Sequence, residues 1–303
     1  MALLRRRRFF GSDSVSISGL IVPIVTPMDE DCTIDFFGLK NHISKLLNVG
    51  AKNFFVGSAI GESKFLSQDD EAKLIEDVIS IVGSKGFVIA GCCADSAELA
   101  VQKVRSAERA GAYACAVNVP LTALTNEVFF MDFFDELLTN TRGNIFLYND
   151  PFVFKRNIPI LGLNKLVNWE RVIGIIDFSN NQPYFKELCN LQGMKIFQGN
   201  DSLAFDSLRA NCSGLASPAS NVLPQLFLNL LKNFRELDTV ASVRQQGEIN
   251  SFIENYFPSQ KKIQAYKYAL SLKGIMKECH SKQLEPLTQK EKDKIDECVK
   301  QFA

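Results

Sequence analysis

The sequence has no excess of either charge, only two histidines and no long apolar run. Lys plus Arg number 34 and Asp plus Glu also number 34 in a chain of 303 residues. Because no net field results, the composition argues against nucleic acid, membrane surfaces and polyanions as partners. No stretch reaches the roughly 18 apolar residues that a membrane-spanning helix needs. We therefore expect a protein that handles a small molecule.

Metal and disulfide chemistry also has little support in the sequence. The eight cysteines include no Cys-x-x-Cys pair, and the two histidines, His42 and His280, lie far from most of them. Zinc sites need such clustered ligands. Cys279 is adjacent to His280, yet neighbouring residues on a helix point their side chains apart. We expect reduced thiols in a cytoplasmic protein, with no metal and no cofactor.

The N-terminal segment, residues 1–17, is basic. It carries four consecutive arginines, Arg5 to Arg8, and several serines, with Asp13 as the single acid before Asp29. It lacks the apolar core of a secretory signal peptide, which is about 7 to 15 residues long. We expect a flexible arm. The alternative is an organellar transit peptide, since such peptides are also basic and poor in acids.

Short β-rich apolar runs alternate with amphipathic helical stretches along residues 18–234, which is typical of βα units in a parallel sheet. Eight repeats without a reversal of pattern favour a closed (β/α)8 barrel over an open doubly wound sheet. Strands are expected at Leu20–Val25, Asn53–Val56, Phe87–Gly91, Ala114–Val117, Ile145–Tyr148, Val172–Ile176, Lys195–Gln198 and Gly214–Ser217.

The strand pattern stops after Val222, and we interpret residues 235–303 as a C-terminal helical extension of the barrel. Helices are expected at Leu223–Phe234, Thr239–Tyr256, Lys261–Lys277 and Gln289–Phe302. A solvated face is expected for the lysines of the third of these helices, which are Lys261, Lys262, Lys267 and Lys273.

Several motifs fall at or just after the expected strands, where barrel enzymes place reactive groups. They are Gly19–Pro27, Gly61-Glu62-Ser63, Leu147–Pro151, Val172–Ser179, Gly199-Asn200-Asp201 and Ser217–Pro224. In this order they resemble the pyruvate-dependent aldolases and lyases that include dihydrodipicolinate synthase, N-acetylneuraminate lyase and 2-keto-3-deoxygluconate aldolase. The resemblance runs from Gly19 to the last helix. It implies a (β/α)8 barrel, lyase activity on 2-oxo acids, and a homodimer or homotetramer.

The chain departs from that family at its central residue. The family's usual pattern at the sixth strand is Val-Gly-Ile-Lys-Asp-Ser-Ser, and here Ile176 stands in place of the lysine. A Schiff base needs a primary amine, whose condensation with a 2-oxo acid turns the carbonyl into an electron sink. Because Ile176 has no amine, we expect the pyruvate-imine mechanism to be absent.

Other positions matched to the family have changed as well. Ala59-Ile60 stands where the family usually has Thr-Thr, although Ser58 can supply a substitute hydroxyl if one residue is inserted. Leu121 takes the place of a tyrosine that a neighbouring subunit would lend. Val153 takes the place of an arginine that would bind a carboxylate. Alternative amines near strand ends are Lys64 and Lys155, both in polar loop contexts that favour a solvated charge.

Tyr148 is retained, and its phenol and the Ser58 hydroxyl are the candidate catalytic groups. The expected substrate pocket is lined by Ala59, Ile60, Glu62, Ile176, Asp177, Gly199, Asn200 and Ser217. Roles that mainly brace loops are implied by the resemblance for Glu62, Asn149, Asp177 and Asn221.

The acids at strand ends do not form an evident metal site. Glu62, Asp150, Asp177 and Asp201 come from different loops, and no histidine accompanies them. Asp150 and Asp177 follow neighbouring strands, so the two carboxyls can approach and raise one pKa for acid–base work.

Three functions of different classes follow. The first is a divergent lyase or aldolase that acts on a 2-oxo acid or sugar acid without the imine, through Tyr148 and nearby acids. The second is a catalytically silent homologue that binds a small metabolite, and the third is an oligomeric scaffold. The resemblance favours a lyase, whereas the loss of the amine favours inactive or changed chemistry on the ancestral fold.

Overall fold

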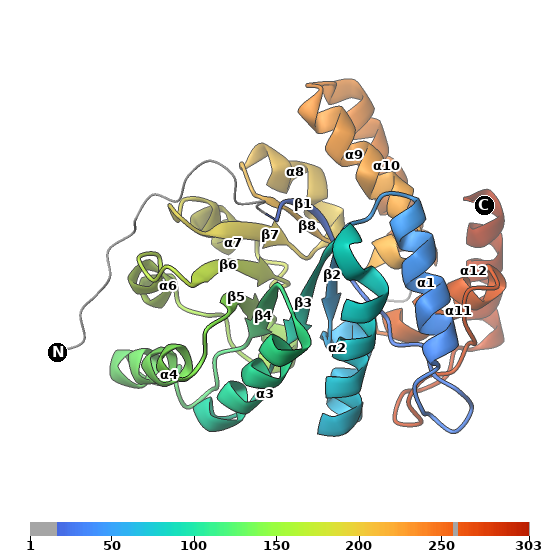
Figure 1. Ribbon diagram of the computed structural model, residues 1–303. Helices are drawn as coiled ribbons and strands as arrows, with labels where there is room; N and C mark the ends of the chain where they lie inside the picture. Colours follow the sequence, from blue (N-terminus) through green and yellow to red (C-terminus); the bar gives the residue numbers. More distant parts are fainter. Residues whose placement is uncertain (1–16, 257–259, 303) are drawn as a thin grey trace.

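The computed structural model describes residues 17–256 and 260–302, and Figure 1 shows their arrangement. Eight parallel strands close into one barrel, with each strand paired to the next in sequence and β1 paired to β8. The strands are β1 (Gly19–Pro23), β2 (Asn53–Val56), β3 (Phe87–Gly91), β4 (Ala114–Val117), β5 (Asn144–Asn149), β6 (Val172–Asp177), β7 (Lys195–Gln198) and β8 (Gly214–Ala216). The expected (β/α)8 barrel with its C-terminal helices is confirmed.

Helices surround the barrel and connect its strands. They are α1 (Phe36–Asn48), α2 (Gln68–Val82), α3 (Ala97–Ala110), α4 (Glu127–Asn140), α5 (Pro151–Phe154), α6 (Ile160–Leu166), α7 (Gln182–Cys189) and α8 (Ala204–Arg209). Local sequence explains several starts, because Asp35, Ser67 and Ser96 each accept a hydrogen bond from a backbone amide of the first helical turn. Gly111, with a φ of 93°, ends α3 in the left-handed conformation that favours glycine.

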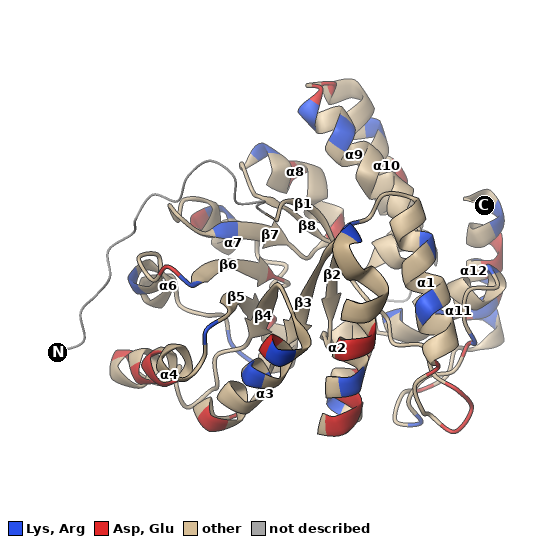
Figure 2. Cartoon of the chain, viewed as in Figure 1, with Lys and Arg blue, Asp and Glu red and all other residues tan. Residues whose placement is uncertain are grey.

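Four further helices form the C-terminal part: α9 (Pro224–Arg235), α10 (Thr239–Tyr256), α11 (Lys262–Leu272) and α12 (Gln289–Gln301). The predicted third helix, Lys261–Lys277, was too long. The chain leaves the helix after Leu272 and adopts a φ of 63° at Gly274. Basic and acidic residues are interspersed over the helices, as Figure 2 shows. No helix in the described part of the chain is long and apolar enough to cross a membrane.

The basic arm predicted for residues 1–17 lies outside the described residues except for Ile17, whose side chain is buried.

Strand residues alternate between two apolar layers, because successive side chains of a strand point to opposite faces. On β5, Ile145 and Leu147 pack outward under the helices, whereas Phe146 and Tyr148 point into the barrel. The interior cluster is rich in aromatic rings and also contains Ile176 of β6. The barrel is therefore a packed core, and ligands can enter only at its rim.

Candidate functional site

A cavity of about 430 Å³ opens at the carboxyl ends of the strands. The loop after β2 contributes Ser58, Ala59 and Ile60, and β5 and its following residue contribute Tyr148 and Asp150. The remaining walls come from α5, from the loops after β6, β7 and β8, and from the C-terminal helices: Phe152, Phe178, Asn180, Gly199, Asn200, Asp201, Ser202, Pro218, Ile253 and Lys262.

Tyr148 lies at the base of this site. Its hydroxyl donates a hydrogen bond to Asp150 Oδ2 (3.3 Å) and accepts one from the Ala59 backbone amide (3.4 Å). Phe55, Phe154 and Phe178 pack against its ring in edge-to-face geometry at centroid distances of 5.2 to 5.6 Å. Burial raises the pKa of the phenol well above its usual range, and the nearby Asp150 charge adds to this effect. Tyr148 therefore serves as a neutral hydrogen-bond donor.

Asp150 is held by the start of α5. Its Oδ1 accepts hydrogen bonds from the backbone amides of Phe152 (3.2 Å) and Val153 (3.3 Å). Burial raises the pKa of this carboxyl, while the bonds from Val153, Tyr148 and Phe152 oppose the rise. Asp150 and Tyr148 thus form a hydrogen-bonded acid pair that faces the cavity.

Position 176 provides no reactive group. Ile176 pairs directly with Tyr148 across β5 and β6 and is 0% exposed. Its side chain belongs to the barrel-interior cluster with Phe55, Phe146 and Phe197, so it contacts hydrocarbon below the cavity. Among the described residues of that cluster none carries an amine.

Asp177 follows Ile176 and points into a polar network beside the cavity. Asn149 Nδ2 donates to its Oδ1 (2.6 Å), and the Ser179 hydroxyl donates to its Oδ2 (2.9 Å). Burial raises the pKa of Asp177 to about 6, and the charge of Asp150 is a further, smaller cause. Asp150 and Asp177 are therefore within electrostatic reach of each other. Asp177 braces the loop after β6 and is not part of the cavity lining.

Asp201 and Ser217 form a second polar group, just after β7 and β8. Asp201 Oδ2 accepts from the Ala219 amide (3.2 Å), and the Ser217 hydroxyl also bonds to this carboxylate. Burial raises the pKa of Asp201 to about 6, and Ser217, Ala219 and the charge of Lys262 oppose the rise. Ser217 itself is buried behind Asp201 rather than in the cavity wall.

Asn221 and Gly199 support the site in different ways. Asn221 Oδ1 accepts a hydrogen bond from the Val25 amide and lies 2.9 Å from His42 Nε2, which ties the segment after β8 to β1 and α1. Gly199 packs against the ring of Phe178 with no space for a side chain. It thereby lets that ring form part of the cavity wall.

Glu62 lies away from the cavity, in a buried ion pair with Lys267 of α11. Its Oε2 accepts from the Ser281 amide (2.8 Å), and Lys267 Nζ donates to the Cys279 carbonyl (2.9 Å). The predicted solvated lysine face was therefore wrong at Lys267, which is 0% exposed. It was also wrong at Lys273, which is half-buried and donates to the Val222 carbonyl (3.1 Å). The cause is that α11 packs against the barrel.

Lys64 and Lys155 line a neighbouring cavity of about 590 Å³ that shares Ala59, Tyr148 and Phe152 with the first. Both lysines are exposed, so neither is desolvated as a nucleophilic amine at neutral pH would need to be.

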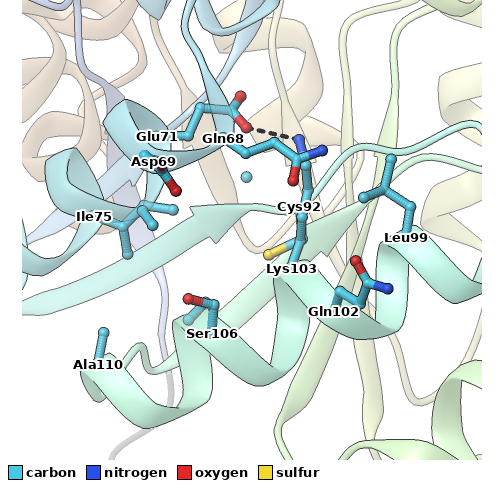
Figure 3. A pocket seen from close by; sticks show the side chains of 13 residues that line it. Gln68, Asp69, Glu71, Ile75, Cys92, Leu99, Gln102, Lys103, Ser106 and Ala110 are labelled. Carbon is cyan, nitrogen blue, oxygen red and sulfur yellow. Dashed lines mark hydrogen bonds and ion pairs between the residues drawn. The ribbon is translucent and has the colours of Figure 1, made fainter.

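A third, smaller hollow of about 170 Å³ lies between α2 and α3, outside the barrel, and Figure 3 shows it. The ion pair between Lys103 and Glu71 (2.7 Å) crosses it. Glu71 thus neutralises the cation there. All cysteines of the described residues are free thiols, and no three potential metal ligands gather in that part of the chain.

The structure brings together at one cavity Ser58, Ala59, Ile60, Tyr148, Gly199 and Asn200, and it places Glu62, Ile176, Asp177 and Ser217 behind or away from its wall. Sequence reasoning missed Ile253 and Lys262 in the wall. No local pattern marks these two residues, because only the packing of α10 and α11 over the barrel rim brings them there.

Barrel enzymes place their active sites at the carboxyl ends of their strands. This chain has a parallel (β/α)8 barrel with polar groups at that end, so its architecture is that of the barrel enzymes and their relatives. The particular family is established by sequence: the chain belongs to the Dihydrodipicolinate synthetase family, whose profile matches residues 16–302.

Individual relatives agree with that assignment. A 4-hydroxy-tetrahydrodipicolinate synthase from Chloroherpeton thalassium is 25% identical over 285 residues, which is 92% of this chain and 93% of that protein. The same enzyme from Staphylococcus saprophyticus is 26% identical over 70% of this chain and 72% of its own length.

Solved structures share the fold. Dihydrodipicolinate synthase from Bacteroides thetaiotaomicron superimposes with a TM-score of 0.89 at 24% identity and covers 95% of this chain and 100% of its own. A prophage protein of the dihydrodipicolinic acid synthase family from E. coli K12, in complex with pyruvate, has a TM-score of 0.88 at 21% identity. It covers 94% of this chain and 98% of its own.

Proposed function

We propose that this chain binds a small 2-oxo acid or sugar acid in the cavity at the barrel rim and does not form an imine with it at position 176. The observation that carries this proposal is the place of Ile176, which is fully buried and directly paired with Tyr148. The apolar side chain of Ile176 offers no amine with which a 2-oxo acid could condense.

Other features of the cavity support ligand binding. Its lining combines hydroxyl, amide and carboxyl groups with the aromatic ring of Phe178, as small-molecule sites do. Pyruvate is the ligand in the related E. coli prophage protein. Its carboxylate and carbonyl oxygens would find donors in this cavity.

If turnover occurs, Tyr148 and Asp150 are the groups able to move a proton. The Tyr148 hydroxyl donates toward Asp150, and burial raises the pKa of both groups. A carboxyl with a raised pKa can hand a proton to a ligand oxygen and take one back within one cycle. We therefore propose changed lyase chemistry through this pair, with a catalytically silent, metabolite-binding homologue as the second candidate.

The experiment is reductive trapping. The protein is incubated with pyruvate and borohydride, and its intact mass is measured; we expect no covalent adduct, whereas pyruvate should still shift ligand-observed NMR signals. Controls are a family member with the lysine, which should gain a pyruvyl mass, and this protein without pyruvate. An adduct, mapped by peptide mass spectrometry to Lys64 or Lys155 for example, would show that the amine has moved, and the proposal of non-imine chemistry would be overturned.

A further inference from the structure

The C-terminal helices place a positively charged side chain in the wall of the cavity at the barrel rim. Lys262 is the first residue of α11, and it lines the cavity together with Ile253 of α10. Among the described residues of the lining, Lys262 is the one with a positive charge. Its side chain is exposed, so its ammonium group can exchange bound water for a ligand.

Two acids lie within reach of this ammonium group. Burial is the main influence on the pKa of Asp150 and Asp201 and raises both, and the charge of Lys262 acts against that rise in each case. The two carboxyls follow β5 and β7, which are separated in the barrel by β6 alone. Lys262 therefore lines the same cavity as both acids, rather than a separate surface.

The rest of the lining suits a polyhydroxy compound. Ser58, Tyr148, Asn180, Asn200 and Ser202 offer hydroxyl and amide groups, which pair with hydroxyls of a ligand. The acids accept hydrogen bonds from such hydroxyls and would repel a carboxylate. A ligand with one carboxylate thus has a single favourable orientation, in which that group faces Lys262.

The position at which an anchor for a carboxylate was expected carries none. Val153, where the family resemblance implied an arginine, is neutral and 42% exposed, and it lines the neighbouring cavity. We infer that Lys262 is the residue that binds the ligand's carboxylate and that it selects monocarboxylic sugar acids over neutral polyols of the same length. This inference rests on the proposed function, since it assigns a residue to the recognition of the proposed ligand.

The test compares two six-carbon probes, D-gluconate and D-glucitol, which differ in that a carboxylate of the first is a hydroxymethyl group in the second. Pyruvate is the third probe. Affinities are measured by calorimetry for the wild type, Lys262→Gln, Lys262→Arg and the matched control Lys261→Gln. Lys261 lies next in sequence, yet it pairs with Glu285 and Glu291 outside the cavity. Circular dichroism checks that each variant is folded.

We expect the wild type to bind gluconate more tightly than glucitol. Lys262→Gln should weaken gluconate and pyruvate binding about tenfold or more, since a charge-assisted hydrogen bond is lost, and leave glucitol unchanged. Lys262→Arg should retain most of the affinity and Lys261→Gln all of it. Added salt should weaken carboxylate binding by the wild type but not by Lys262→Gln.

The two ideas fail in different ways. Equal carboxylate affinity in the wild type and Lys262→Gln would overturn the role of Lys262 while the proposed function stands. Pyruvate binding that depends on Lys262, without a preference for gluconate over glucitol, would overturn the selection of sugar acids. No binding of gluconate or pyruvate by the wild type would overturn the proposed function and this inference together.

Discussion

At the residue scale, the site is defined by which side chains reach the cavity and which support it. Tyr148 and Asp150 face the cavity as a hydrogen-bonded pair, whereas Ile176 is buried in the apolar barrel interior and is not part of the cavity lining. Asp177 is the next residue of β6, yet its carboxylate accepts hydrogen bonds from Asn149 and Ser179 and so holds the loop after this strand. The cavity therefore has a polar lining, while position 176 carries no amine.

Ile176→Lys alone should not restore aldolase activity. The new ammonium would enter an apolar cluster, and Val153 and Leu121 would still lack the groups that the family pattern has at those places. We expect pyruvate release in an aldol-cleavage assay to be indistinguishable from that of the wild type, with folding checked by circular dichroism. Robust turnover by this single variant would show instead that the rest of the pocket is intact.

Asp177 should make stability depend on pH. Its pKa is about 6 in the folded protein and about 3.8 in the unfolded chain, so the folded state binds more protons between these values. The stability that protonated Asp177 contributes is complete below about pH 4 and is lost as the pH rises through 6. The Asp177→Asn variant has no carboxyl that titrates at this position, so its stability does not fall in this way. In urea unfolding, the free energy of unfolding of the variant minus that of the wild type should rise by up to about 3 kcal/mol from pH 4 to 7.

The matched control for that series is Asp206→Asn, whose carboxylate is exposed on α8. The difference in free energy of unfolding between this control and the wild type should hardly change with pH over the same range. A flat difference for Asp177→Asn as well would show that its carboxyl titrates normally in the folded protein.

At the scale of elements, α11 connects the C-terminal helices to the barrel by two different lysines. Lys267 pairs with Glu62 after β2, and Lys262 lines the cavity. Residues five positions apart on an α-helix differ in direction by about 140°, so the two amines reach different surroundings. One helix thus contributes both a buried anchor and a cation at the cavity.

Lys267→Met should destabilise the protein by about 3–5 kcal/mol, because Glu62 would remain buried without its partner. Urea unfolding measures the change. The double variant Glu62→Gln/Lys267→Met should recover part of the loss, since it leaves no uncompensated charge. Lys277→Met is the control: its pair with Asp29 is exposed, so the change should stay within about 1 kcal/mol. A single variant as stable as the control would mean that the buried pair contributes nothing net.

At the scale of the whole molecule, apolar side chains are exposed on the loop after β4 and the start of α4. Leu121 is 51% exposed, Val128 65% and Phe129 53%. Such a patch is costly in a monomer, and symmetric self-association would cover it. We propose that the protein is at least a dimer through this region, which keeps apolar character although the tyrosine of the family pattern is replaced by Leu121.

Leu121→Asp should therefore shift the protein toward monomer. Light scattering at micromolar concentration should report at least a dimer for the wild type and a lower mass for the variant, because a buried carboxylate opposes association. Val240→Asp, at an exposed apolar position on α10, should leave the mass unchanged. A wild type that is already monomeric would remove this interface and the scaffold hypothesis with it.

The sequence by itself determined the barrel, its eight strands and an isoleucine, with no amine, at position 176. Strand periodicity and the order of motifs are local signals, because each strand shows its two faces and each loop its polar residues in a few consecutive positions. The same signals predicted that Ser58, Tyr148 and Asn200 lie at or just after strand ends, and these three residues line one cavity.

Only the tertiary structure decided which groups enter the cavity and which are buried elsewhere. The sequence predicted Glu62 as a pocket residue, and it is a buried partner of Lys267. Lys262 is exposed, as predicted, but it also lines the cavity. Amphipathic periodicity predicts which face of a helix is apolar, but it does not predict which residues that face, or the charged residues beside it, will contact. The packing of α11 on the barrel, between residues about 200 positions apart in the chain, sets that outcome.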